Sequence, residues 1–172
     1  GVMVLASDLE SESARRLGWD LSNEHCADRA DLNQLGICGS DDFNRLVSFK
    51  NNNMNNIPVD IGCFDFCWSS CAFEHLGSIR RGLDFVRNSA RLLNPGGIAV
   101  HTTEFNLSSN ERTLDNNESF VIFRRQDIEL LVSELRAENV MVEAIDYCPG
   151  SDPLERYIDL PPYQQNLHLR LQ

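Results

Sequence analysis

The polar residues with the clearest chemistry follow short apolar segments of the sequence. Asp8 comes directly after one such segment, and His75 comes shortly after another. A carboxylate can accept charge-strengthened hydrogen bonds from the hydroxyl groups of a ligand, and a histidine can remove a proton near neutral pH. The candidate site residues that follow apolar segments are Asp8, Leu9, Asn53, Met54, Ser69, Ser70, His75, His101, Thr103 and Glu104.

The elements that must position these residues can be predicted from hydrophobic patterning. Continuous apolar runs such as VMVLAS (2–7) are typical of strands buried on both faces. The expected strands are residues 2–7, 45–49, 64–69, 98–102, 120–123, 140–147 and 166–171. The expected helices are residues 11–18, 27–35, 78–93 and 127–138, the last with Asp127 as its N-cap.

The segment 78–93 has the most regular pattern. Its apolar residues recur at intervals of three and four, which predicts one buried stripe along a helix: Ile79, Leu83, Val86, Ala90 and Leu93. The turn Asn94-Pro95-Gly96-Gly97 should end this helix, because proline cannot continue it and glycine accepts a positive φ.

Strands that alternate with helices predict an α/β fold with a parallel sheet. The last two expected strands have no helix between them, which predicts an antiparallel pair at the edge. Ligands of such sheets bind beyond the carboxyl ends of the strands. Because the candidate residues follow strands, we expect them at that end of the sheet.

Three motifs in the middle of the chain resemble those of one family. They are the strand FDFCWS (64–69), the Glu74-His75 turn, and LLNPGG (92–97) followed by IAVHTTEF. In this order and spacing they resemble the second half of the class I S-adenosylmethionine-dependent methyltransferases. The resemblance implies a Rossmann-like, mostly parallel sheet with an antiparallel C-terminal strand pair. It also implies S-adenosylmethionine as the cofactor and a small-molecule or glycan-type methyl acceptor.

The resemblance further implies which residues bind the cofactor. Asp8 matches the carboxylate that accepts hydrogen bonds from both ribose hydroxyls, and Leu9 would pack beside the ribose or adenine. Asn53 and Met54 stand where relatives bracket the adenine; Asn53 replaces the usual acidic residue, but its amide oxygen can still accept a hydrogen bond. The alternatives are that Asp8 caps the following helix and that Asn53 has no role in binding.

The remaining candidates would face the methyl group and its acceptor. Ser69 and Ser70 would lie under the methionine portion of the cofactor, and His75 would be the general base. The alternative for His75 is that it only packs or caps at the start of a helix. The residues expected to recognise the acceptor are His101, Thr103 and Glu104.

One family motif does not occur in this sequence. The family opens with a strand that leads into a glycine-rich loop, roughly G-x-G-x-G, and the sequence contains no such loop. It begins at what resembles the second strand of the family. We therefore expect a single partial methyltransferase domain over residues 1–172, a fragment without the first strand and helix.

The charge of the chain argues against several partners. Fifteen Lys and Arg and 26 Asp and Glu give a net charge of −11, which repels phosphate backbones and anionic lipids. No apolar run reaches the ~18 residues of a membrane span, and the first residues lack the pattern of a signal peptide. We expect a cytoplasmic protein that binds neither nucleic acid nor membranes.

The cysteines do not predict a metal site. Cys63, Cys67 and Cys71 are four residues apart, but a strand through this segment would not bring their side chains together. The spacing of His75, His101 and Glu104 also gives no support for metal binding. We therefore expect six buried thiols and no bound metal.

Two other functions fit parts of the sequence. A non-catalytic methyltransferase-like module could lack the glycine-rich loop and act through partners. A nicotinamide-dependent dehydrogenase would share the acidic residue after a strand, but its G-x-G-x-x-G motif is absent and the LLNPGG and Glu74-His75 motifs fit it poorly. Methyl transfer is the leading interpretation.

Overall fold

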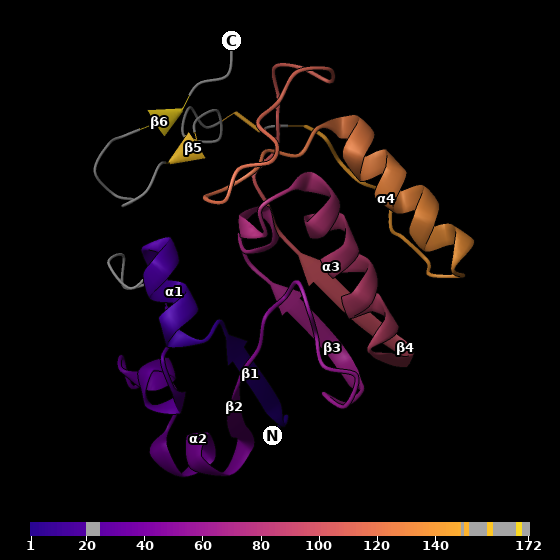
Figure 1. Ribbon diagram of the computed structural model, residues 1–172. Coiled ribbons are helices and arrows are strands. Elements are labelled where there is room, and N and C mark those ends of the chain that lie inside the picture. Colours follow the sequence, from indigo (N-terminus) through magenta and orange to yellow (C-terminus); the bar gives the residue numbers. More distant parts are fainter. Residues whose placement is uncertain (20–24, 149, 152–157, 160–167, 170–172) are drawn as a thin grey trace. The chain divides into compact units, whose positions relative to one another are not determined.

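A computed structural model describes residues 1–19, 25–148, 150–151, 158–159 and 168–169 (Figure 1). The chain divides into two compact units, residues 1–58 and 59–172. Each unit combines helices with a pair of parallel strands, and the second also contains an antiparallel pair. The predicted α/β fold with parallel strands is confirmed.

The first unit is built around the parallel pair β1 (Val4–Asp8) and β2 (Val47–Asn51). Their register pairs Val4 with Val47 at one end and Asp8 with Asn51 at the other. Helix α1 (Ser11–Leu17) follows β1 and ends at Gly18, whose φ of 80° suits a glycine after a helix. Asp8 therefore lies at the carboxyl end of a parallel strand, as expected.

The segment between α1 and β2 differs from the expectation. The predicted helix 27–35 is a shorter 3-10 helix, η2 (Arg29–Asn33), capped by Asp28. An additional helix, α2 (Ser40–Leu46), includes the first residues of the expected strand 45–49. The sequence of α2, SDDFNRL, has too few apolar residues for a clear helical period, so patterning did not reveal it.

The second unit is built around the parallel pair β3 (Phe64–Ser69) and β4 (Leu93–His101). The short 3-10 helix η3 (Phe73–His75) follows β3, and helix α3 (Ile79–Arg91) begins after the N-cap Ser78. Helix α3 packs against β4 on one side and against helix α4 (Arg125–Ala137) on the other (Figure 1). The prediction for β3 is confirmed, and so is a helix within 78–93, but this helix ends at Arg91 and Leu93 belongs to β4.

The LLNPGG motif forms an irregularity inside β4 rather than a turn before it. Phe64 pairs with Leu93, whereas Phe66 pairs with Ile98, so the four residues 94–97 stand opposite the single residue Asp65 and the register shifts by three. Gly96 has a φ of 83°. A Cβ atom on Gly97 would lie 3.1 Å from the carbonyl oxygen of Asp65 on the neighbouring strand. Glycine therefore permits the close approach of the two strands here.

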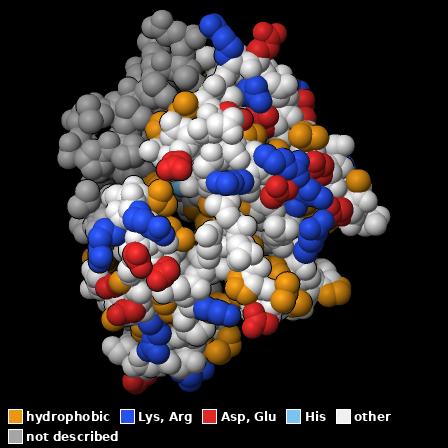
Figure 2. Space-filling model, in the orientation of Figure 1, with side chains coloured by type: hydrophobic (Ala, Val, Ile, Leu, Met, Phe, Trp, Pro, Cys, Tyr) orange, Lys and Arg blue, Asp and Glu red, His pale blue; other side chains and the backbone are white. Residues whose placement is uncertain are grey.

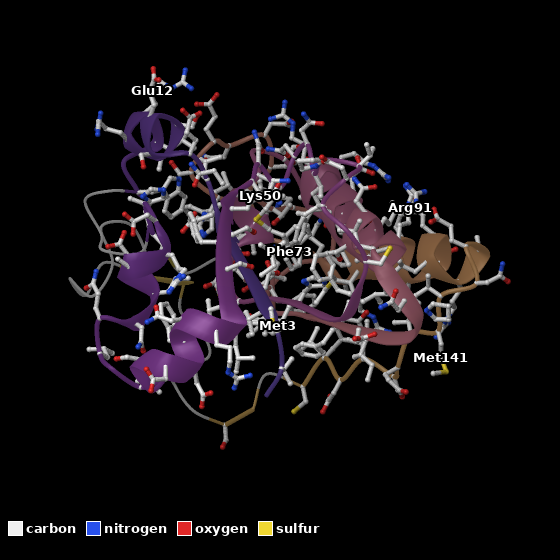
Figure 3. All side chains as sticks on the ribbon, turned by 90° about the horizontal axis from the view of Figure 1, so that it is seen from below. Met3, Glu12, Lys50, Phe73, Arg91 and Met141 are labelled. Carbon is white, nitrogen blue, oxygen red and sulfur yellow. The ribbon has the colours of Figure 1, made fainter. Side chains whose placement is uncertain are left out.

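The core of the second unit lies between α3, η3 and the segment 120–123. Leu83 is 1% exposed, and Phe73 points into the interior, whereas Met141 lies at the surface (Figure 3). Gly82 faces this core: a Cβ atom at this position would lie 2.5 Å from Cζ of Phe123 and 2.9 Å from the carbonyl oxygen of Phe73. Helix α3 therefore approaches its neighbours as closely as a residue without a side chain allows.

Ion pairs join α3 to α4 across their outer sides. Arg80 contacts Glu134 at 2.8 Å, and both Arg87 and Arg91 contact Glu138. Figure 2 shows basic and acidic side chains interleaved over these two helices. The exposed side of the helix pair is thus covered by charges, while its inner side is apolar.

Two expectations near α4 are corrected. Residues 120–123 are not a strand; they form buried core, with Val121, Ile122 and Phe123 at 0% exposure. Asp127 is not the N-cap of α4 but its third residue: the N-cap is Arg124, whose backbone N–H donates to Asp127 Oδ2 at 2.9 Å. This is the capping-box arrangement, in which the acidic residue binds back to the N-cap.

The C-terminal strand pair is also corrected in position. An antiparallel pair is present, but it joins β5 (Ile158–Asp159) to β6 (His168–Leu169). Residues 140–147 form no strand in the structure, although their sequence alternates as a strand would. Of the expected strand 166–171, residues 166–167 and 170–171 lie outside the described residues. No helix in the described part of the chain combines the length and apolar character needed to cross a membrane.

Candidate functional site

The carboxylate of Asp8 is held in place by backbone donors of its own unit. The N–H of Leu9 donates to Oδ1 at 2.7 Å, and the N–H of Cys26 donates to Oδ2 at 2.9 Å. His25 Nε2–H donates to the carbonyl oxygen of Leu9 at 2.7 Å. Each carboxylate oxygen has capacity for a further hydrogen bond. Asp8 is therefore not an N-cap for α1, whose N-cap is Glu10, but a fixed acceptor at the end of β1.

The loop after β2 offers a different acceptor from the one expected. Asn53 is exposed, and its Oδ1 already accepts from the N–H of Asn55 at 2.9 Å, while Met54 is half-buried. Asn52 Oδ1 is buried and has no hydrogen-bond donor in the structure. The N–H of Asn52 donates to the carbonyl oxygen of Asp8 at 2.8 Å. Asn52 therefore brings an unsatisfied acceptor next to Asp8.

Asn52 was missed because the sequence of this loop, NNNMNN, contains several equivalent asparagines. The distinguishing signal is strand register. Asn51 pairs with Asp8, so the next residue is the first to extend beyond both strands. That register depends on pairing between β1 and β2 and cannot be derived from the loop alone.

In the second unit, the structure brings the predicted residues Ser69 and His101 together. Ser69 Oγ lies 2.8 Å from His101 Nδ1, and Ser89 Oγ of helix α3 lies 2.9 Å from His101 Nε2. The imidazole also packs edge-on against Phe73 and Phe85. Burial lowers the pKa of His101 to about 4, so the ring is neutral near pH 7. Both ring nitrogens of His101 are thus occupied by serine hydroxyls of the protein.

Ser70 is exposed and lies one residue beyond β3. Its hydroxyl accepts from Thr102 Oγ1 at 3.4 Å. Thr102 also accepts, through its carbonyl oxygen and through Oγ1, from the N–H of Cys71 at 3.1 Å. These contacts tie together the carboxyl ends of β3 and β4, which places residues 70–75 beside residues 101–104.

Glu74 is a buried acid at this end of the strands. Its side chain is fully buried, Thr103 Oγ1 donates to Oε2 at 3.1 Å, and Oε1 has no hydrogen-bond partner among the residues that the structure describes. Burial raises the pKa of the Glu74 carboxyl to about 7. The side chain of Glu104 is half-buried, and one of its carboxylate oxygens lies within 4.8 Å of a carboxylate oxygen of Glu74. The sequence motif pointed to His75, but its neighbour Glu74 is the more strongly perturbed group.

His75 follows Glu74 in η3. Its Nδ1–H donates to the carbonyl oxygen of Ser119, in the loop before α4. Burial lowers the pKa of His75, and the Ser119 carbonyl opposes this shift by favouring the protonated ring. With Nδ1 protonated, the neutral imidazole carries its lone pair on Nε2. This tautomer is the one that can accept a proton at Nε2.

A large cavity lies inside the second unit. It has a volume of about 1440 Å³, is lined mostly by apolar side chains of β4, α4 and the segment 139–148, and is open to solvent on one side, where Ile98 and Met141 are exposed. The three residues predicted to recognise the acceptor all line it: His101, Thr103 and Glu104. The charged residues on its walls are acidic, namely Glu104, Glu143 and Asp146. Its apolar and acidic walls are suited to an apolar, non-anionic molecule.

The prediction of six buried thiols is wrong. Cys63, Cys71 and Cys148 are exposed, and Cys26, Cys38 and Cys67 are partly exposed. Cys71 departs from the strand pattern because β3 ends at Ser69, and Cys71 adopts a φ of 43°. The direction of the Cys71 side chain is therefore not set by the alternation of strand β3.

Comparison with known proteins supports one family. The model of a family described as "Methyltransferase domain" matches residues 1–101, which is more than half of the chain. No curated protein matches the chain. The matched segment spans β1 to β4 and includes every candidate site residue except Thr103 and Glu104.

Proposed function

Because the chain belongs to the methyltransferase domain family, we propose that it transfers a methyl group from S-adenosylmethionine to a small-molecule acceptor. The observation that carries this proposal is the position of Asp8. Its carboxylate ends the first parallel strand and is oriented by two backbone N–H groups. A carboxylate so fixed is suited to accept hydrogen bonds from a pair of vicinal hydroxyls.

The polar groups of the first unit fit the nucleoside part of the cofactor. Asp8 would accept from the ribose hydroxyls, with Leu9 packed beside the sugar. Asn52 Oδ1 is a buried acceptor without a donor, and the exocyclic amine of adenine is a donor of the kind it lacks. Met54, half-buried in the same loop, would pack on the adenine. Asn53 would then serve mainly to shape the loop through its bond to Asn55.

The acceptor would bind in the second unit. The cavity lined by His101, Thr103 and Glu104 is large enough for a small organic molecule, and its acidic and apolar walls favour one without negative charge. Ser69 and Ser70 would allow close approach at the carboxyl end of β3. The bound cofactor supplies a methyl group on a positively charged sulfur, which is the electrophile.

The chain itself must orient the acceptor and remove its proton. We assign proton removal to His75, because its Nδ1–H is held by the carbonyl oxygen of Ser119 and Nε2 is then the basic atom. Orientation contributes through proximity, which by itself supplies a large share of the rate in group transfer. His101 would contribute by fixing the ends of β3 and β4 rather than by direct contact through its nitrogens, which bind Ser69 and Ser89.

Calorimetric titration with S-adenosylhomocysteine tests the cofactor, since it needs no acceptor. Saturable one-to-one binding supports the proposal. Binding of a nicotinamide dinucleotide in place of S-adenosylhomocysteine would overturn it in favour of a dehydrogenase.

Label transfer tests catalysis. The protein is incubated with S-adenosylmethionine carrying a labelled methyl group and with a mixture of small metabolites, and S-adenosylhomocysteine formation is measured together with label in the small molecules. Transfer that His75→Ala abolishes supports the proposal. Cofactor binding without any transfer to small molecules would favour the non-catalytic module and would contradict an enzymatic role.

A further inference from the structure

Three possible metal ligands meet at the carboxyl ends of β3 and β4. Cys71 Sγ, a carboxylate oxygen of Glu74 and a carboxylate oxygen of Glu104 all lie within 4.8 Å of one another. Ligand atoms at about 2.0–2.3 Å from one zinc ion are at most about 4.6 Å apart, so small side-chain adjustments bring the three atoms to an ion. We propose that Cys71, Glu74 and Glu104 form a binding site for a divalent cation of the zinc type.

A buried, unsatisfied oxygen points to a missing ligand. Glu74 is 0% exposed, and its Oε1 has no hydrogen-bond partner among the described residues, while Oε2 accepts from the hydroxyl of Thr103 at 3.1 Å. Burying a carboxylate without a partner is costly, and buried polar atoms in native proteins are nearly always satisfied. A cation between Glu74 and Glu104 would compensate both negative charges and would give the buried Glu74 carboxylate a further partner.

The three ligands come from two segments, Cys71 and Glu74 from the residues after β3 and Glu104 from the residues after β4, and the backbones of both are hydrogen bonded. The N–H of Cys71 donates to Thr102, and the N–H of Val121 donates to the carbonyl oxygen of Glu74 at 2.8 Å. The N–H of Phe123 donates to the carbonyl oxygen of Glu104 at 3.4 Å. The backbones of the ligands are thus held by Thr102, directly after β4, and by the buried segment 120–123. A cation would find the site largely formed rather than having to order it.

The chemistry of the donors selects the type of ion. Calcium and magnesium take oxygen ligands, whereas a cysteine thiolate favours zinc and related transition metals. Three protein ligands leave a fourth tetrahedral position open, which is the arrangement of zinc sites that bind water or a substrate atom. Glu104 also lines the acceptor cavity, but none of the three ligands is assigned to cofactor binding or proton removal, so metal binding can be tested without methyl transfer.

Cobalt(II) provides a direct probe, because a cobalt–thiolate bond gives a near-ultraviolet charge-transfer absorption. The full chain, freed of metal with a chelator, is titrated with Co²⁺ and then with Zn²⁺. We expect one equivalent of Co²⁺ to produce the charge-transfer band and Zn²⁺ to remove it. No saturable binding of either ion would overturn the proposal.

Variants locate the site. Cys71→Ser should abolish the band, and Glu74→Gln and Glu104→Gln should each weaken Co²⁺ binding by at least about tenfold. Cys63→Ser is the matched control, since Cys63 is an exposed cysteine of the same unit outside the cluster; it should leave the band unchanged. Loss of the band in Cys63→Ser, or its retention in Cys71→Ser, would place the metal elsewhere and refute the site. Thermal unfolding identifies any variant that does not fold. If Glu74→Gln does not fold, Glu104→Gln tests the contribution of the carboxylates, because Glu104 is the less buried of the two.

Discussion

The hydroxyl of Ser69 lies 2.8 Å from Nδ1 of His101 and joins the carboxyl ends of the two parallel strands of the second unit. Ser89 donates to the carbonyl oxygen of Val86 at 2.8 Å, so its hydroxyl accepts from His101 Nε2–H. Ser69 must then donate to Nδ1. The contacts therefore stabilise one neutral tautomer of His101, the one with its proton on Nε2.

This network predicts how stability changes with pH. Burial lowers the pKa of His101 from the ordinary 6.5 to about 4. Between these values the unfolded chain binds a proton that the folded protein does not. The contribution of His101 to the free energy of unfolding is therefore complete above about pH 6.5. It is lost as the pH falls toward 4, and the free energy of unfolding then falls by up to about 1.4 kcal/mol per pH unit. Urea unfolding at a series of pH values measures the free energy of unfolding.

The His101→Gln variant is the control for that experiment. It removes the titrating ring, so subtracting its profile from that of the parent cancels the contribution of the other ionisable groups. Profiles that run parallel between about pH 6.5 and 4 would show that His101 is protonated equally in both states.

Asp8 should be needed for cofactor affinity. Asp8→Ala should weaken the binding of S-adenosylhomocysteine by about 1.5–3 kcal/mol, the range for hydrogen bonds to a charged group, and Asp8→Asn should weaken it less because one oxygen remains. Calorimetric titration gives both values. Asp42→Ala is the control, since Asp42 is an exposed carboxylate of the same unit that pairs with Arg45 on α2. An unchanged dissociation constant in Asp8→Ala would restrict Asp8 to holding the backbone of Leu9 and Cys26.

His75 should affect turnover without affecting cofactor binding. If it removes the proton of the acceptor, His75→Ala should lower the turnover number by roughly 10²-fold or more, since general-base catalysis contributes 10²–10⁴. The affinity for S-adenosylhomocysteine serves as the internal control and should remain nearly constant. A turnover number within about threefold of the parent value would contradict a base role and leave His75 a structural role, which includes its contact with the Ser119 carbonyl.

Leu83 should be one of the most sensitive core positions. It lies on the inner side of α3 at 1% exposure, and truncation of a buried leucine costs about 2–5 kcal/mol. Leu83→Ala should therefore lower the free energy of unfolding by this amount, measured with urea. Leu130→Ala on α4 removes the same atoms from a residue that is 48% exposed and should cost far less. Equal losses in the two variants would contradict the assigned core.

The elements that could be predicted from the sequence are those with complete local signals. The regular apolar spacing of α3 and the short apolar run of β3 each specify one structure. Helix α2 lacks such a pattern, and residues 140–147 have the alternation of a strand but no pairing partner in the structure. Strand formation depends on a neighbour that is distant in sequence, which local patterning cannot supply.

The candidate site shows the same limit. The sequence correctly predicted that Asp8 lies at the end of β1, because this prediction needs only the point at which the apolar run ends. It did not reveal that His101 binds two serines or that Glu74 is buried beside Glu104, because these contacts join β4 to α3 and η3. The cysteines were misjudged for a similar reason: Cys71 leaves the strand through a positive φ that its sequence does not announce.

The contact between Gly82 and the ring of Phe123 restricts the order in which the two positions can change. Gly82→Ala made first would place a methyl group 2.5 Å from Cζ of Phe123, an overlap that overpacked cores relieve only by moving the backbone. Phe123→Leu made first would instead open space that the methyl group at position 82 could then fill in part. Rescue would stay incomplete, because the carbonyl oxygen of Phe73, 2.9 Å away, belongs to the backbone and cannot be trimmed by substitution. Variation at this packed pair should therefore proceed from the aromatic ring to the glycine, with an intermediate that has a small void rather than a clash.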